Sequence, residues 1–97
     1  MKTPDLSKCH SIEEIRAEVA RCLEGETVVR NAREARRFFK QAGLGGRVNA
    51  RTFFRERREI PSIGPLRRTI LVYVDIQEYY TDPGSVDYVY SYDIITY

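Results

Sequence analysis

Apolar residues recur at helical spacing near the start of the chain, at Ile12, Ile15, Val19, Cys22 and Leu23. Ser11 precedes this pattern, and Glu14 stands three residues after Ser11, which is the arrangement of a helix capping box. Gly25 is suited to end the helix, because glycine commonly follows the last helical residue. The pattern predicts a first helix over residues 11–24, followed by a short extended or linking piece at residues 27–29.

Two more helices are predicted between residues 31 and 59. The second has an apolar side at Ala32, Ala35, Phe38, Phe39 and Ala42, and it ends at Gly43, Gly45 and Gly46. The third is capped by Asn49 and runs to about Glu59, with Ala50, Phe53 and Phe54 as its buried side. On another face of this third helix, Arg51, Arg55 and Arg58 stand at i, i+4 and i+7 and form one stripe.

The last third of the chain has the alternating pattern of a long β-hairpin. Residues 69–80 and 86–97 are rich in Ile, Val and Tyr, and they flank a turn sequence, TDPGS, at residues 81–85. Pairing Tyr80 with Val86 predicts one apolar face, made of Ile70, Val72, Val74, Ile76, Val86, Tyr88, Tyr90, Tyr92 and Ile94. The opposite face then carries Asp75, Gln77, Asp87, Ser91 and Asp93.

These elements predict one α+β domain over residues 1–97, with three helices (residues 11–59) followed by a long C-terminal antiparallel β-hairpin (residues 69–97). Two strands alone are marginally stable in water, so we expect the hairpin to lie against the helices. All four Phe residues fall in the predicted helices and all seven Tyr residues in the hairpin. We expect the two sets to meet in the core.

Charge is strongly segregated along the chain, although the net charge is only +2. Residues 30–68 hold twelve basic side chains, eleven of them Arg, against three Glu, a net of +9. Residues 1–29 have a net charge of −2, and residues 69–97 have no Lys or Arg and a net of −5. Because the guanidinium group binds phosphate bidentately, this arginine-rich middle third indicates a polyanionic partner.

Composition excludes several classes of protein. The 97 residues suffice for one modest core, and no apolar run approaches the roughly 20 residues that span a bilayer. Residues 1–8 contain no apolar stretch typical of a secretory signal. We therefore expect a cytoplasmic protein that does not bind membranes and that keeps Cys9 and Cys22 reduced.

Few side chains here support catalysis. His10 is the sole histidine, and Cys9, His10 and Cys22 lack a convincing fourth zinc ligand at recognisable spacing. The G-x-G-G sequence at residues 43–46 follows a predicted helix rather than a strand, which is typical of a loop and not of a phosphate-binding motif. We expect no enzyme activity, no cofactor and no metal.

The segment ARTFFRERREIPSIGPLRRTI, residues 50–70, resembles part of the MerR-like, excisionase-type winged helix-turn-helix DNA-binding domain. In that family a recognition helix precedes a short proline-containing loop and a basic strand that opens the wing. The resemblance extends over residues 28–72, with residues 31–44 as the first helix. It implies a winged-helix-like fold and a transcription or recombination-directionality factor of the kind often encoded by phages or mobile elements.

By this resemblance, Arg51 and Arg55, with Arg47 and Arg58 nearby, would face the major groove, and Arg67 and Arg68 would contact backbone phosphates from the wing. The predicted nucleic-acid-binding residues, which include two on the second helix, are Arg36, Arg37, Arg47, Arg51, Arg55, Arg58, Arg67 and Arg68.

Two other functions remain open at this point. One is a protein-interaction module, such as a phage-encoded inhibitor, which binds a protein partner or a second copy through the acidic face of the hairpin. The other is a small ribonuclease toxin that uses arginine, lysine and tyrosine. DNA binding is the leading hypothesis because the +9 segment and the arginine stripe both favour it.

Overall fold

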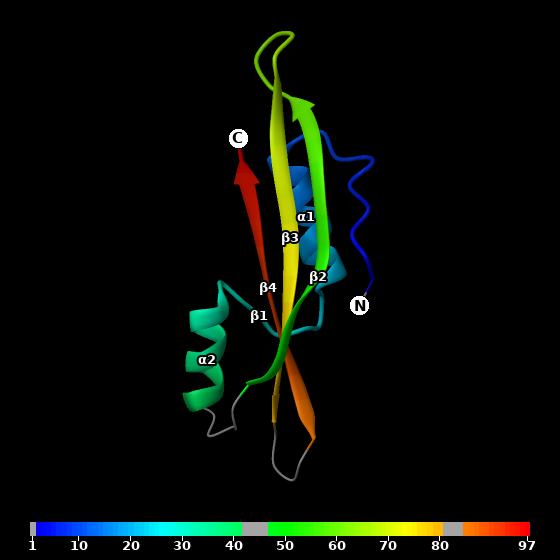
Figure 1. Ribbon diagram of the computed structural model, residues 1–97. Helices are drawn as coiled ribbons and strands as arrows, with labels where there is room; N and C mark the ends of the chain where they lie inside the picture. Colours follow the sequence, from blue (N-terminus) through cyan, green and yellow to red (C-terminus); the bar gives the residue numbers. More distant parts are fainter. Residues whose placement is uncertain (1, 42–46, 81–84) are drawn as a thin grey trace.

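The protein has two helices and four strands in a computed structural model that describes residues 2–41, 47–80 and 85–97. The elements in chain order are α1 (Ile12–Cys22), β1 (Val28–Val29), α2 (Ala32–Gln41), β2 (Arg47–Pro61), β3 (Arg67–Tyr80) and β4 (Val86–Thr96). The molecule is elongated, with extents of 55 × 22 × 18 Å, and the three long strands run along its long axis (Figure 1).

The strands form one mixed sheet in the order β1-β4-β3-β2. The short strand β1 pairs in parallel with β4, and the other neighbours are antiparallel. Tyr80 pairs with Val86, so the predicted register of the hairpin is confirmed. β3 is the central strand, and β2 forms one edge of the sheet.

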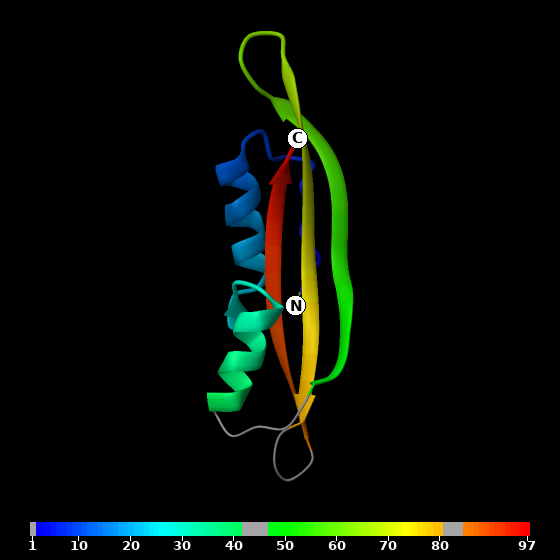
Figure 2. The same ribbon diagram turned by 60° about the vertical axis from the view of Figure 1, so that its left-hand side comes forward.

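The two helices contact opposite faces of the sheet. The β3 side chains that pack with α1 are the even-numbered Ile70, Val72, Val74 and Ile76, whereas Tyr79 packs with α2. Because successive side chains of a strand point to opposite faces, α1 and α2 lie on different sides. They also lie towards opposite ends of the long axis (Figure 2).

The predicted first helix is confirmed, and its start is explained by local hydrogen bonds. The Ser11 hydroxyl accepts from the backbone N–H of Glu14 at 3.1 Å, and the Glu14 carboxylate accepts from the backbone N–H of His10 at 3.2 Å. These bonds satisfy backbone donors that an uncapped helix end would leave open. Ile15, Val19, Cys22 and Leu23 are buried, as the apolar pattern predicted.

The second predicted helix and the short extended piece before it are also confirmed, as α2 and β1. Phe39 is buried and stacks on Tyr79 with ring centroids 4.0 Å apart, and Phe53 meets Tyr90 edge to face at 6.4 Å. The expected meeting of Phe and Tyr in the core is confirmed for these pairs only, because Phe38, Tyr80, Tyr88 and Tyr97 are exposed. Within the described residues, neither helix has the length and apolar character that a membrane crossing needs.

The predicted third helix is wrong, because residues 47–61 form strand β2. Asn49, Phe53, Phe54 and the many Arg and Glu residues suit a helix locally, but β3 has buried side chains on both faces and needs a neighbour on each edge. β2 is that neighbour and pairs with β3 from Arg47 to Pro61. The fold of three helices plus a hairpin, and the winged-helix arrangement with it, are therefore wrong for this chain.

The predicted polar face of the hairpin is only partly correct. Asp75, Asp87 and Asp93 lie on the face opposite α1, as expected, but the same face also buries Leu71, Gln77, Tyr79, Val89 and Ser91. The Tyr79 hydroxyl donates a hydrogen bond of 2.9 Å to Oε1 of Gln77, which gives both oxygens a partner where they are buried. The glycine stop after α2 (residues 43, 45 and 46), Ala42 and residues 81–84 of the predicted turn lie outside the described residues.

Residues 2–10 lie along the α1 side of the sheet and complete the main core there. Leu6 is fully buried among residues of α1, β2 and β3, and Cys9 is buried beside it. Arg58 of β2 holds this segment, since its Nη1 donates a hydrogen bond of 2.7 Å to the backbone oxygen of Leu6. One charged side chain thus links the edge strand to the amino-terminal segment.

Replacing Arg58 with Ala is expected to lower the free energy of unfolding by about 1–3 kcal/mol, because a charge-assisted hydrogen bond is removed at a half-buried position. The matched control is Arg55→Ala, an exposed arginine of the same strand, which should change stability by about 0.5 kcal/mol or less. Urea unfolding followed by circular dichroism measures both. Equal effects of the two substitutions would contradict the structural role of Arg58.

Candidate nucleic-acid interface

The arginines of β2 are divided between the two faces of the sheet. Arg51 pairs with Ile76 and Arg58 with Ile70, so both lie on the face that α1 covers. Arg55 pairs with Tyr73 and lies on the opposite face, because directly paired residues of neighbouring strands share a face. The predicted stripe of Arg51, Arg55 and Arg58 required a helix, so the structure does not bring these three side chains together.

Arg57 joins Arg55 on the open face, which we define as the sheet face opposite α1. It pairs with Leu71 of β3, and its guanidinium lies 5.8 Å from the ring centre of Tyr97. The helical interpretation missed Arg57, because i, i+4 spacing from Arg51 and Arg55 leaves it out. Alternation in a strand would have grouped it with Arg55.

Three of the eight predicted residues have partners within the protein. Arg58 lies 3.3 Å from Glu56 and is hydrogen-bonded to Leu6, which makes it part of the fold. Arg67 lies 3.7 Å from Glu59, and Arg51 lies 3.9 Å from Glu78. The Arg67 pair is exposed, and Arg67 also donates to the backbone oxygen of Glu59 at 3.3 Å, whereas Glu78 in the Arg51 pair is half-buried. An exposed ion pair contributes about 0–1 kcal/mol.

The remaining exposed arginines of β2 and the start of β3 have no carboxylate within 4.0 Å in the part of the chain that the structure describes. They are Arg47, Arg55, Arg57 and Arg68. Together with Arg51 and Arg67 they form what we call the arginine edge. It extends from one end of β2 to the other and on into β3, on the strand whose outer side pairs with no other described strand.

Arg36 and Arg37 lie on α2 and are exposed. Phe39 of the same helix stacks on Tyr79, and Tyr79 pairs with Arg47 at the start of β2. These contacts bring the predicted basic residues of α2 to the same end of the molecule as Arg47. The exposed basic residues thus extend along β2 on both faces of the sheet, with α2 at one end.

Carboxylates lie among these arginines on the open face. Asp75 pairs with Thr52 of β2, and together with Arg55 and Tyr73 these residues line a shallow pocket of about 240 Å³. Burial raises the pKa of Tyr73, and Asp93 and Asp75 raise it further, so the phenol stays protonated at neutral pH. The acidic face that was expected to bind a protein partner is therefore not separated from the basic side chains.

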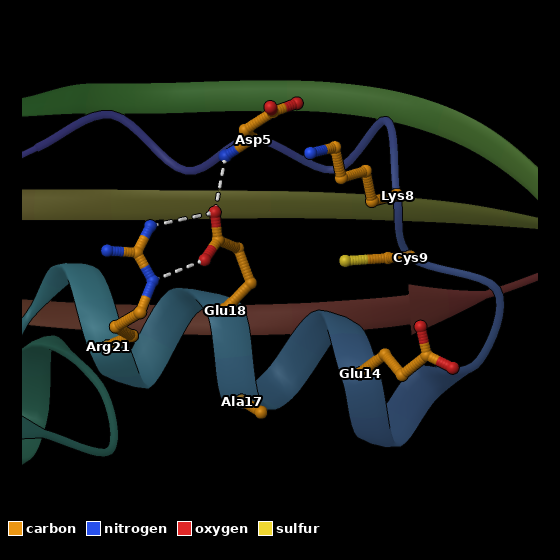
Figure 3. A pocket seen from close by; sticks show the side chains of 7 residues that line it. All are labelled: Asp5, Lys8, Cys9, Glu14, Ala17, Glu18 and Arg21. Atoms are coloured by element: carbon orange, nitrogen blue, oxygen red, sulfur yellow. Dashed lines mark hydrogen bonds and ion pairs between the residues drawn. The ribbon is translucent and has the colours of Figure 1, made fainter.

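A larger pocket, of about 490 Å³, opens between residues 5–9 and α1 (Figure 3). Within it Glu18 accepts hydrogen bonds from Arg21, at 2.7 and 3.1 Å, and from the backbone N–H of Asp5 at 2.8 Å. These bonds lower the pKa of Glu18, with the bond from Arg21 as the main cause. The Ser7 hydroxyl similarly lowers the pKa of Asp5. The Glu18 carboxylate thus holds the amino-terminal segment against α1, whereas the Asp5 carboxylate forms a local turn with Ser7.

Cys9 borders the same pocket, but its environment does not favour a reactive thiolate. Burial raises its pKa, and the negative charges of Glu18 and Glu14 raise it further. Cys9 and Cys22 are both free thiols. Across residues 2–41, 47–80 and 85–97, no group of three or more His, Cys, Asp or Glu side chains is arranged to hold a metal ion.

The stability contributed by Glu18 is expected to depend on pH. Because its folded-state pKa lies below the ordinary value of 4.5, this contribution is fully present above that value and is lost as pH falls through the lowered pKa. Urea midpoints of the wild type and Glu18→Gln should therefore differ most at neutral pH and converge as the pH falls below 4.5 and through the lowered pKa. Glu13→Gln, at an exposed position of the same helix, is the control. A Glu18→Gln difference that is constant over this range would contradict the assignment.

Comparison with known proteins gives no family for this chain: no family model matches it, and no curated protein or solved structure shows significant similarity to it.

Proposed function

We propose that the protein binds nucleic acid, with duplex DNA as the leading candidate, along the arginine edge. The observation that carries the proposal is the density of exposed guanidinium groups on one edge strand and its continuation, four of which have no carboxylate within 4.0 Å among the described residues. Arginine offers five donors in a planar fork that fits phosphate oxygens and guanine edges. Four solvated groups of this kind without a nearby carboxylate suit a polyanion.

The length of the strip supports an extended duplex rather than a small anion. β2 has 15 residues, which at about 3.3 Å per residue corresponds to roughly 50 Å. One turn of B-DNA rises about 34 Å, with phosphates at intervals of about 1.7 Å along the axis when both strands are counted. The arginine edge is therefore long enough to reach phosphates on both sides of a groove. Strands, as well as helices, are used by proteins to enter the grooves of DNA.

The same arginines have a structural explanation, which is protection of an edge strand. Charged side chains on an exposed edge discourage pairing with other chains. Protection alone predicts no affinity for DNA and no special role for Arg55 and Arg57, so binding measurements distinguish the two explanations.

A second candidate function is a protein-interaction module, and the unpaired outer side of β2 favours it. An extended segment of a partner could add to the sheet there by backbone hydrogen bonds, with the arginines selecting an acidic sequence. Copurification with one specific protein would support this candidate over DNA binding, provided that the ultraviolet absorbance of the purified sample shows no nucleic acid.

Affinity for duplex DNA is expected to fall steeply with salt. If about six phosphates are neutralised, the association constant should decrease roughly 10³-fold between 50 and 200 mM monovalent salt, because bound cations are released from the DNA. Fluorescence anisotropy with a labelled random duplex, repeated with single-stranded RNA, measures this dependence. Binding that does not change over this range, or no binding at 50 mM, would overturn the proposal.

Removing two arginines of the open face should weaken binding and flatten the salt dependence. For Arg55→Ala with Arg57→Ala, the slope of log K against log salt should fall by about two, one for each phosphate that is no longer neutralised. The control is Lys8→Ala with Arg16→Ala, two exposed residues on the α1 side, which changes the net charge equally. If both double variants weaken binding to the same extent, net charge rather than the arginine edge is responsible.

A further inference from the structure

The connection between β2 and β3 projects beyond the rest of the molecule. β4 pairs with β3 only from Ile70 onwards, whereas β2 and β3 remain paired to Pro61 and Arg67. The two strands thus continue as a two-stranded ribbon past the ends of β4 and α1 (Figures 1 and 2). We call residues 61–66 at its end the tip.

The tip is an ordered turn with apolar side chains facing water. The backbone N–H of Ser62 donates to the oxygen of Leu66 at 2.9 Å, and that of Leu66 donates to the oxygen of Ile63 at 3.1 Å. Gly64 adopts a φ of +59°, which favours glycine, and so closes the turn. Ile63 is 81% exposed and Leu66 64% exposed, the first being the most exposed large apolar residue among those described. Ile63 also borders a pocket of about 350 Å³ that the tip shares with residues 10–13 at the start of α1.

Positive charge lies directly behind the apolar tip. Arg67 and Arg68 follow Leu66, and Arg57 stands on β2 opposite Leu71, shortly before the tip. Of these three, Arg57 and Arg68 have no carboxylate within 4.0 Å among the described residues. An apolar end backed by arginines is suited to a surface that is anionic outside and apolar within, and a base-pair stack lined by phosphates is such a surface.

We propose that the tip enters the minor groove of duplex DNA and inserts Ile63 or Leu66 between base pairs, so that the DNA bends. This inference rests on the proposed function. The minor groove is about 6 Å wide, which excludes a helix but admits side chains at the end of a narrow turn. Leu, Ile and Pro are the side chains that typically wedge base steps apart, which kinks the duplex by about 20–90°. Arg67 and Arg68 would then contact the phosphates that flank the kinked step.

The test uses the full chain and a duplex of about 25 base pairs with a donor and an acceptor dye at its two ends. Binding is followed by anisotropy and bending by energy transfer between the dyes. The wild type should bring the ends closer, and the Ile63→Ala/Leu66→Ala double variant should bind within about tenfold of it but no longer bend the DNA. Tyr80→Ala, at a 53% exposed aromatic residue at the opposite end of β3, is the matched control and should bend DNA like the wild type.

The outcomes separate this inference from the proposed function. Wild-type binding without bending, or equal bending by the double variant, would overturn the wedge and leave DNA binding intact. No wild-type binding to duplex DNA would overturn both. A parallel sedimentation assay measures binding to vesicles of phosphatidylserine and phosphatidylcholine. If the protein binds vesicles through Ile63 and Leu66 and does not bend DNA, the tip binds a lipid surface and the proposed insertion between base pairs is overturned. Because both residues are exposed, unfolding curves of the variants should match that of the wild type.

Discussion

The central position of β3 is the constraint on which the rest of the fold depends. This strand buries apolar side chains on both faces, Ile70 and Val72 towards α1 and Leu71 and Tyr79 away from it. A strand of this kind needs hydrogen-bonding neighbours on both edges and cover on both sides. β2 and β4 supply the edges, and α1, residues 4–9 and α2 supply the cover. The pairing of β2 along the length of β3, which places the arginines of β2 on the edge of the sheet, follows from this requirement.

The requirement of β3 also explains where sequence reasoning succeeded and failed. The capped apolar pattern of α1 and the strict alternation of the hairpin are local signals, and the pairing of Tyr80 with Val86 followed from them. The segment 47–61 carries the opposite local signal, because Arg, Glu and the adjacent Phe53 and Phe54 suit a helix. Its strand conformation is imposed by the unsatisfied edge of β3, which is a tertiary effect. Two signals were available: the run of apolar residues at 70–72, which is typical of a central strand, and the turn with Gly64 and Pro65 between two segments of similar length.

Because residues 47–61 form a strand and not a helix, the arginines that share a face differ from those that were predicted. Arginine content alone indicated which segment of the chain is basic. Which arginines share a face, however, depends on whether side chains repeat with the spacing of a helix or of a strand. A helical period grouped Arg51, Arg55 and Arg58, whereas the strand groups Arg55 with Arg57 and turns Arg58 inwards to Leu6. Burial of a guanidinium stem against the amino-terminal segment could not be read from the sequence, because the contact joins residues 52 positions apart.

The separation of the core into two clusters has a consequence for motion. The larger cluster joins α1 to the middle of the sheet, whereas α2 is held mainly by Ala35 and Phe39 against Tyr79 and Val89. So small an attachment allows α2 to detach by sub-global opening while the sheet and α1 stay folded. Amide protons of α2 should then exchange with solvent through an opening of lower free energy than those of β3, and the helix carrying Arg36 and Arg37 can adjust its position without unfolding the molecule.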